Sequence, residues 1–401
     1  TEAHLAGTPA HCPLARRARD MAFAEAVHEA FAGTCQALGL VGMAWHVERG
    51  EEMAIEGRCG RESVLEDAKQ LSPDQRWHWG SCAKALTATV LASVVDEGIF
   101  LAGWDTRLGD ILDLPEPGGE GTSLGHSTLR QLAAHRGGVC LDLEAAVEEA
   151  LRTSLEESTA TDQRMAFARE LAGRALEFEP GAGFGYSNAG YVVLSAAVEK
   201  ATGKPWEDLV MQRVVEPLCM RSFGFGSPPR DEAAGGALGH DEDGEVDKTD
   251  GTDALWHHAS FSVHSTLADW AIFARLHLRT LQGDATALAV LGVSASSAAV
   301  LHTPVSPAAD GEPCNGQEKP LSMAMGWQCL WDEPPEGQRG LAVATGVLWH
   351  WGTNFRFNSG AYLRAEPPLL MLVGSNSGSS LARLASRTAF DAVIGASSTE
   401  S

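Results

Sequence analysis

The sequence predicts an α+β fold in which one antiparallel β-sheet is assembled from both ends of the chain. Short extended segments lie near the start, at residues 41–47 and 53–57, and again near the end, at 355–363 and 369–375. A mostly helical stretch, residues 111–255, lies between them. Strands at both ends with helices between them favour a single sheet flanked by helices, with a helical lobe inserted into it.

The N-terminal part of this sheet region is preceded by a helix. Residues 1–15 are expected to form a loose tail, and residues 16–38 carry apolar side chains at helical spacing. Arg49-Gly50-Glu51 separates the first two extended segments and is typical of a hairpin turn. Residues 81–97 then predict a long apolar helix that Gly98 can end.

The remaining elements follow from the same patterns. Helices are predicted at 128–135, 143–153, 162–176, 191–201, 206–215, 266–281 and 381–394, with a further strand at 341–349. The Gly-, Pro- and Asp-rich stretch 227–253 predicts an exposed loop with almost nothing to bury. The expected organisation is a discontinuous sheet domain, residues 16–110 and 256–396, with a helical domain at 111–255 inserted into it.

Composition restricts the classes of partner. The 401 residues include 53 Asp and Glu against 30 Lys and Arg, a formal net charge of −23. Such a surface repels nucleic acids and anionic lipids, and no run of about 18 apolar residues offers a membrane span. The eight cysteines contain no C-x-x-C pair, which disfavours a zinc site. A small-molecule substrate is therefore the expected partner.

The first chemical motif is Ser81-Cys82-Ala83-Lys84, at the start of the predicted 81–97 helix. Residues i and i+3 share a helix face, so the Lys84 ammonium can reach the Ser81 hydroxyl. Desolvation lowers the pKa of a buried lysine, which can then activate the serine. Cys82 is a possible alternative nucleophile, but on a helix it is turned about 100° away from Ser81. Taken alone, the tetrad is also compatible with coincidence.

The second motif is Tyr186-Ser187-Asn188, inside a glycine-rich segment without phosphate-loop spacing. A nearby cationic lysine would lower the pKa of the Tyr186 phenol, which could then serve as general base. Asn188 could hydrogen-bond a substrate carbonyl or amide. The alternative is a polar loop in which Asn188 is the N-cap of the next helix.

The third motif is His350-Trp351-Gly352-Thr353, directly after the predicted 341–349 strand. Gly352 would let a substrate approach the strand backbone closely. The Thr353 and Ser81 backbone N–H groups could together form an oxyanion hole. The alternative is an ordinary strand turn with an exposed His350.

Together the three motifs, in this order, resemble the serine β-lactamase and penicillin-binding protein superfamily, in particular its class C-type serine hydrolases and their esterase-like branch. The segments 128–135 and 262–273 are also similar to stretches of this superfamily. The resemblance covers about residues 35–395. It implies a β-lactamase/transpeptidase-like fold, with a sheet flanked by helices and a mostly helical second lobe.

The resemblance also implies a mechanism. Ser81 would attack a carbonyl and form an acyl-enzyme, and Lys84 and Tyr186 would share the role of general base. The implied substrate-binding residues are Asn188, His350, Trp351, Gly352 and Thr353. No metal and no cofactor is required.

One departure bears on the substrate. His350 stands where β-lactamases and many peptidases carry Lys, and histidine is mostly neutral at pH 7. The flanking Trp349 and Trp351 would form an aromatic wall. We therefore expect an esterase-like hydrolase of carboxylic esters or amides. The alternatives are a β-lactamase, a D-amino-acid peptidase or amidase, or a non-catalytic binding protein on the same scaffold. The acyl group, the oligomeric state and the compartment stay open.

Overall fold

A computed structural model describes residues 13–50, 52–117, 122–139, 142–230, 236–246, 253–305, 323–329 and 346–398. Its central sheet has five strands in the order β2-β1-β8-β7-β6, and all neighbours are antiparallel. The strands are β1 (Gly42–Arg49), β2 (Met53–Gly60), β6 (Val347–Thr353), β7 (Asn358–Arg364) and β8 (Leu369–Ser375). Because β1 pairs with β8, the two ends of the chain meet within one sheet, which confirms the predicted fold class.

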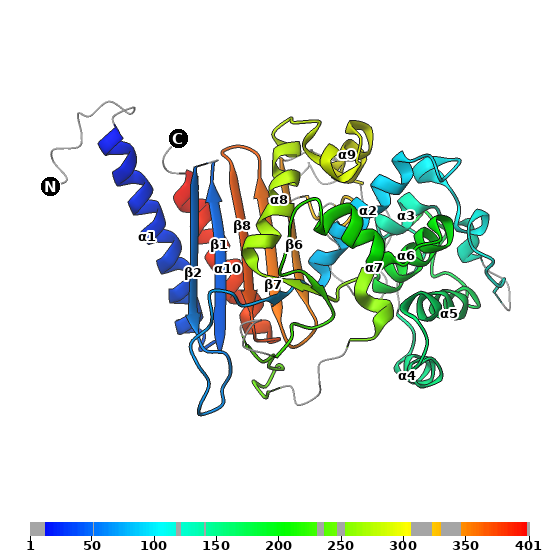
Figure 1. Cartoon of the computed structure of the whole chain (residues 1–401), viewed down its shortest axis with the longest axis horizontal. Coiled ribbons are helices and arrows are strands. Elements are labelled where there is room, and N and C mark those ends of the chain that lie inside the picture. The colour runs from blue at the N-terminus through cyan, green and yellow to red at the C-terminus, as the bar shows by residue number, and fades with distance from the viewer. Residues whose placement is uncertain are drawn as a thin grey trace.

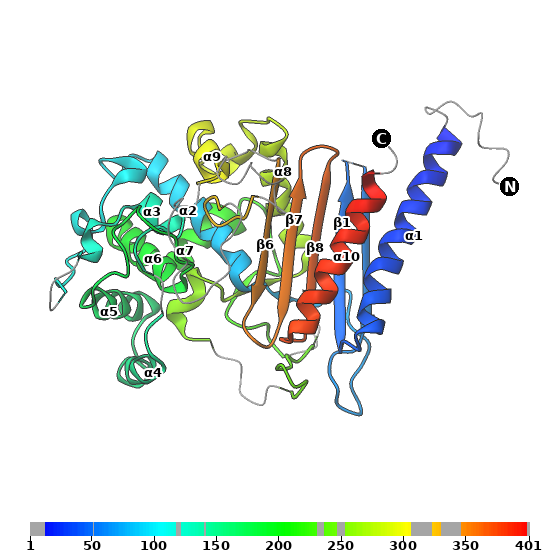
Figure 2. The same cartoon turned by 180° about the vertical axis from the view of Figure 1, so that it is seen from behind.

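Helices cover both faces of this sheet. The helices α1 (Pro13–Ala37) and α10 (Ser380–Ser398) lie side by side on one face, as the views from front and back show (Figures 1 and 2). Between them and the strands lies an aromatic core in which Phe31 stacks on Trp45 with ring centroids 5.2 Å apart. The helix α8 (Leu267–Leu281) covers the opposite face. The helix α1 begins at Pro13, inside the segment expected to be a tail.

The helical lobe lies beyond the β6 edge of the sheet (Figure 1). It contains α2 (Ala83–Asp96), α3 (Leu129–Ala133), α4 (Ala145–Ser154), α5 (Ala160–Ala172), α6 (Asn188–Thr202) and α7 (Trp206–Val210). These helices match the predicted ones in order and approximate position. The short helix α9 (Ala295–His302) was not predicted. Nearly every residue of α2 is buried, which makes it the central helix of the molecule.

A second, small sheet supports the segment before α2. It consists of β3 (Trp77–His78), β5 (Val263–Ser265) and β4 (Gly224–Phe225), in the order β3-β5-β4. Strands of two or three residues are too short to show a hydrophobic period, so the sequence did not predict them. From β3 the chain passes through a 3₁₀ turn, Gly80–Cys82, into α2. Ser81 therefore lies in this turn, just before the regular helix.

Two predicted segments need correction. The predicted strand at 341–349 is instead β6, which continues through the third motif to Thr353, so that motif is no strand turn. Residues 341–345 lie outside the described residues. The predicted exposed loop at 227–253 contains a fully buried residue, His240, whose backbone N–H donates to the carbonyls of Arg356 and Asn376. The described part of that loop is thus anchored to the sheet.

The hydrophobic core does not stop at the sheet. One cluster of buried side chains extends from β6, β7 and β8 through α8 and α2 into the helical lobe. The division into a sheet domain and an inserted domain remains a prediction. Within the described residues, every helix is too short or too polar to cross a membrane.

Candidate active site

The first and third motifs meet where the 3₁₀ turn before α2 touches β6. Gly80 has a left-handed backbone, with φ of +52°, and a Cβ added to it would lie 2.2 Å from the Thr353 amide nitrogen. A Cβ on Gly352 would lie 2.0 Å from the Trp79 carbonyl oxygen and 2.9 Å from the Ser81 nitrogen. Both glycines are needed because two backbones are in contact here. At Gly352, where a substrate was expected to approach the strand backbone, the chain's own segment Trp79–Ser81 lies instead.

The two backbone amides at this contact lie close to the outer edge of β6. β6 is the outer strand of the sheet, and Trp349 exchanges hydrogen bonds of 2.9 and 2.8 Å with Gln328 across its outer edge. In an antiparallel strand every second residue presents its N–H to the same edge. The Thr353 N–H therefore faces outward like that of Trp349, on the side where the turn that carries Ser81 lies. The two amides that the sequence predicted as an oxyanion hole lie next to each other.

Lys84 is the charged centre of the site. Its side chain is fully buried, and Nζ lies 3.2 Å from Ser81 Oγ, 2.7 Å from Asn188 Oδ1 and 2.8 Å from the Ser260 carbonyl oxygen. Burial lowers the pKa of Lys84 to about 7, although Asp142 and Cys82 act in the opposite direction. A large fraction of Lys84 is therefore uncharged near neutral pH.

The contacts of Lys84 also orient its neutral form. A neutral amine has two N–H donors and one lone pair. Asn188 Oδ1 and the Ser260 carbonyl accept the two N–H groups, since neither oxygen can donate. The lone pair is then left for the Ser81 hydroxyl, as proton abstraction from Ser81 requires. The Ser260 carbonyl was not predicted from the sequence.

Tyr186 corrects one expectation. The sequence interpretation was that Lys84 lowers the pKa of the phenol, but burial raises this pKa well above its usual value, and an interaction with the Ser81 side chain offsets only part of the rise. The Lys84 ammonium lies 4.8 Å from the centre of the Tyr186 ring. Tyr186 is thus at the site as predicted, but as a neutral phenol.

A buried histidine supports the second motif. His135 stacks on Tyr186 with ring centroids 4.4 Å apart, and its Nδ1 accepts a hydrogen bond from the Ser187 N–H at 3.1 Å. The segment 128–135 was singled out in the sequence for its resemblance alone, without a role for His135. The end of that segment thus lies against Tyr186 and Ser187.

Asn188 holds Lys84 and is not the N-cap of α6. Ser187 caps the helix by accepting from the Gly190 N–H at 2.9 Å. The Asn188 carbonyl oxygen accepts from Lys84, and its amide donates to Asp142 Oδ2 at 3.3 Å. Its contact with substrate stays a prediction.

His350 faces the site but is not exposed. Only 2% of its surface is accessible, and its ring centre lies 6.1 Å from that of Tyr186. Burial, reinforced by the Lys84 charge, lowers its pKa to about 3, so it is neutral, as the sequence suggested. Its Nδ1–H donates to the Trp351 carbonyl at 2.6 Å, which leaves Nε2 as an acceptor. Within the described residues Nε2 has no hydrogen-bond partner.

The predicted aromatic wall is wrong. Successive side chains of a strand point to opposite faces of the sheet. Trp349 and Trp351 lie on the face covered by α10, where Trp351 stacks on Phe390 with ring centroids 5.2 Å apart. His350 points the other way, so Trp351 does not line the site with its side chain.

A cavity of about 530 Å³ opens beside Tyr186 and Asn188. Its apolar lining comes from Val139, Leu143, Leu171, Ala175 and Leu176, and its polar lining from Asp142, Glu144, Arg174 and Glu177. It is wide enough for a small organic group next to the residues that contact Ser81.

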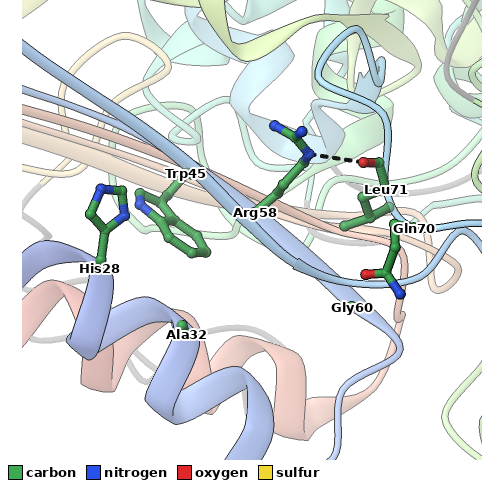
Figure 3. Close-up of a pocket in the computed structure, with 8 residues that line it drawn as sticks. His28, Ala32, Trp45, Arg58, Gly60, Gln70 and Leu71 are labelled. Carbon is green, nitrogen blue, oxygen red and sulfur yellow. Dashed lines mark hydrogen bonds between the residues drawn. The ribbon is translucent and has the colours of Figure 1, made fainter.

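A second cavity, of about 510 Å³, lies between α1 and β2 around His28, Trp45 and Arg58 (Figure 3). None of its lining residues belongs to the three motifs.

Cys82 is not a second nucleophile. Burial raises the pKa of its thiol to about 12, and Sγ donates to the His350 carbonyl at 3.4 Å. A thiol held in this state is a poor source of thiolate. The thiol links the turn before α2 to β6.

Comparisons with known proteins identify relatives of this chain. The family model described as Beta-lactamase matches residues 24–396. The chain is 27% identical over 151 residues to penicillin-binding protein 4 of Amycolatopsis lactamdurans, and 49% identical over 57 residues to esterase EstB of Burkholderia gladioli. These matches cover 37% and 14% of this chain and 35% and 14% of those proteins, so the chain spans about a third or less of the relatives it matches.

The fold also matches solved structures. The class C β-lactamase from Rhodobacter sphaeroides superposes with a TM-score of 0.69 at 19% identity, over 92% of this chain and 99% of that one. At this identity the likeness shows the fold alone. The match of the family model extends over nearly the whole chain, and the three motifs converge on one site. The chain therefore belongs to the Beta-lactamase family of serine hydrolases.

Proposed function

We propose that this protein is an esterase-like hydrolase that cleaves carboxylic esters, and more slowly amides, through an acyl-enzyme on Ser81. The observation that carries the proposal is the Lys84 amine. This amine is buried and has a pKa of about 7. The acceptors Asn188 Oδ1 and the Ser260 carbonyl orient it so that its lone pair faces Ser81 Oγ, 3.2 Å away. A binding protein has no need of a serine activated in this way.

The reaction begins with transfer of the Ser81 proton to Lys84 Nζ as Oγ bonds to the substrate carbonyl carbon. The Ser81 and Thr353 N–H groups stabilise the negative charge that develops on the carbonyl oxygen. Neutral Tyr186 donates a hydrogen bond at Oγ and passes the proton from Lys84 to the leaving oxygen or nitrogen. Water then attacks the acyl-enzyme, loses its proton to the same groups and releases the carboxylic acid.

The neutral state of His350 favours ester substrates over substrates that carry a carboxylate. A neutral, buried imidazole offers an acceptor at Nε2 where a cation would make charge-assisted bonds to a carboxylate. The apolar part of the cavity beside Tyr186 suits an uncharged acyl or leaving group. The alternative function is that of a β-lactamase or a D-amino-acid peptidase or amidase, which could use the same Ser81 and Lys84 chemistry.

The test is covalent labelling combined with a substrate panel. A fluorophosphonate probe should modify the wild type at Ser81, and Ser81→Ala should lose both labelling and turnover of p-nitrophenyl esters. Its unfolding free energy should change by no more than about 1–2 kcal/mol, because one hydroxyl is removed. Labelling that persists in Ser81→Ala would disprove the assignment. Faster turnover of nitrocefin than of every ester would favour the β-lactamase alternative, and faster turnover of D-alanyl anilides would favour the peptidase or amidase alternative.

A further inference from the structure

A buried histidine holds the turn that carries Ser81. His78 is the last residue of β3 and is 1% exposed. Its Nδ1 accepts the Gly80 backbone N–H at 3.0 Å, and its Nε2 lies 3.1 Å from Asp253 Oδ2. Because a backbone N–H can only donate, Nδ1 carries no proton. The single proton of the neutral ring is therefore on Nε2 and is donated to Asp253.

The Gly80 N–H belongs to the left-handed residue on which the contact with β6 depends. Gly80 is the residue at φ +52° on which an added Cβ would lie 2.2 Å from the Thr353 nitrogen, and the next amide in the chain is that of Ser81. Glycine adopts this backbone region without steric cost, but it is also the most flexible residue, so contacts with its surroundings must fix its orientation. His78 supplies such a contact from one side, and the Ser359 hydroxyl supplies one from the other by donating to the Trp79 carbonyl at 2.6 Å.

Asp253 connects this support to the surroundings of Lys84. The Ser262 hydroxyl also donates to Asp253, and Trp79 donates its N–H to the Val263 carbonyl at 2.9 Å. The short segment from Asp253 to Val263 thus holds the Ser81 turn, and it also provides the Ser260 carbonyl that accepts from Lys84.

His78, Asp253 and Ser262 do not form a second catalytic triad. In such a triad the carboxylate and the serine lie on opposite nitrogens of the imidazole. Here Asp253 and Ser262 both lie on the Nε2 side, at 3.1 and 3.4 Å, and Ser262 is fully buried. Nδ1 is occupied by the backbone, so His78 has no lone pair with which to activate a hydroxyl.

We propose that His78 and Asp253 are a positioning pair, which holds the Gly80 N–H and through it the Ser81 amide in the orientation that stabilises the oxyanion. This inference rests on the proposed function, because the Ser81 amide can stabilise an oxyanion only if Ser81 attacks a carbonyl group. His78 is a positioning residue, since among the described residues its hydrogen bonds reach Gly80, Asp253 and Ser262 and not the reacting atoms.

Two substitutions at His78 separate positioning from packing. In His78→Asn the side-chain oxygen can take the place of Nδ1 and accept the Gly80 N–H, whereas His78→Leu can accept nothing. The burst phase with p-nitrophenyl acetate reports acylation. We expect His78→Leu to slow acylation by about 10- to 100-fold, below the loss of a whole oxyanion donor. KM should stay within about twofold, and His78→Asn should recover most of the rate.

His264 is the matched control. It pairs directly with His78 across the small sheet, is also buried, and binds the Gly226 carbonyl instead of the Ser81 turn. His264→Leu should lower the thermal midpoint as His78→Leu does and leave the acylation rate of the folded protein within about twofold. An equal loss of acylation in both variants, or no rescue by His78→Asn, would overturn the proposal.

A measurement without turnover tests the pair independently. Long-range ¹H–¹⁵N spectra of the wild type, assigned by comparison with His78→Asn, should show an unprotonated Nδ1 and a protonated Nε2 for His78. A proton on Nδ1 overturns the proposal even if His78→Leu fails to fold. A wild type that shows the expected tautomer but is not acylated at Ser81 would instead contradict the proposed function.

Discussion

The backbone of Gly80 lies against that of Thr353 so closely that a Cβ on Gly80 would come within 2.2 Å of the Thr353 nitrogen. These residues are 273 positions apart in the chain, yet their contact brings the Ser81 amide to the edge of β6. The site therefore depends on two backbones touching, which only glycine permits at this position.

Gly80→Ala should destabilise the protein more than the left-handed conformation alone explains. Gly98 is the matched control, since it has φ of +73° and no atom within 4 Å of an added Cβ. Gly98→Ala should cost about 1–2 kcal/mol for the left-handed backbone. Gly80→Ala should cost about 1–3 kcal/mol more, because the new methyl group is forced against backbone. Urea unfolding of both variants measures the difference, and equal costs would contradict the contact.

The pH dependence of acylation should follow Lys84. Proton abstraction needs the neutral amine, whose fraction rises with pH through the Lys84 pKa of about 7. We expect kcat/KM for p-nitrophenyl acetate to rise with pH around 7 and then to level off. The exposed Lys200→Ala variant should keep this profile. A profile without an inflection between pH 6 and 8 would exclude Lys84 as the base.

Stability should carry the same signature. Between pH 7 and 10.5 the lysine is protonated in the unfolded chain and neutral in the folded protein, so the unfolded state binds more protons. The free energy of unfolding should therefore rise with pH across this window. Lys84→Met removes the titrating group and should lose that part of the slope, which chemical denaturation at several pH values can measure.

Losses at Lys84 and Tyr186 should not add. Each of Lys84→Ala and Tyr186→Phe should slow acylation by about 10²–10⁴-fold, the range for loss of acid–base catalysis. Both act on the proton of Ser81, so the double variant should be little slower than the worse single variant. Burst kinetics of the three variants give the comparison, and a multiplicative loss would mean that the two residues act in separate steps.

The sequence predicted what depends on local spacing. Ser81 and Lys84 were placed together because three residues separate them near a helix start, and the sheet followed from the extended segments at both ends. The Lys84 contacts with Asn188 and Ser260 join residues 104 and 176 positions apart, so no local pattern contains them.

The errors have physical reasons as well. The aromatic wall was predicted from the bulk of the two tryptophans that flank His350, whereas both belong to β6, where alternation turns Trp349 and Trp351 to the opposite face of the sheet. The pKa of Tyr186 was misjudged because proximity to a charge can be inferred from a motif, while burial cannot. His78 was missed because β3 has only two residues.

Substrate preference should not depend on protonation of His350. Its pKa of about 3 keeps the imidazole neutral throughout the pH range in which the enzyme can be assayed. If a carboxylate were bound by a protonated His350, nitrocefin would be favoured at pH values below about 6.5, where an ordinary histidine gains its charge. We expect no such gain.

The ratio of kcat/KM for nitrocefin to that for p-nitrophenyl acetate measures this preference. The titration of Lys84 cancels in this ratio, because both substrates acylate the same serine. This ratio should stay below one and constant within about twofold from pH 5 to 8. A ratio that rises as the pH falls through 6.5 would show that His350 is charged and meets the carboxylate, and it would favour the β-lactamase alternative.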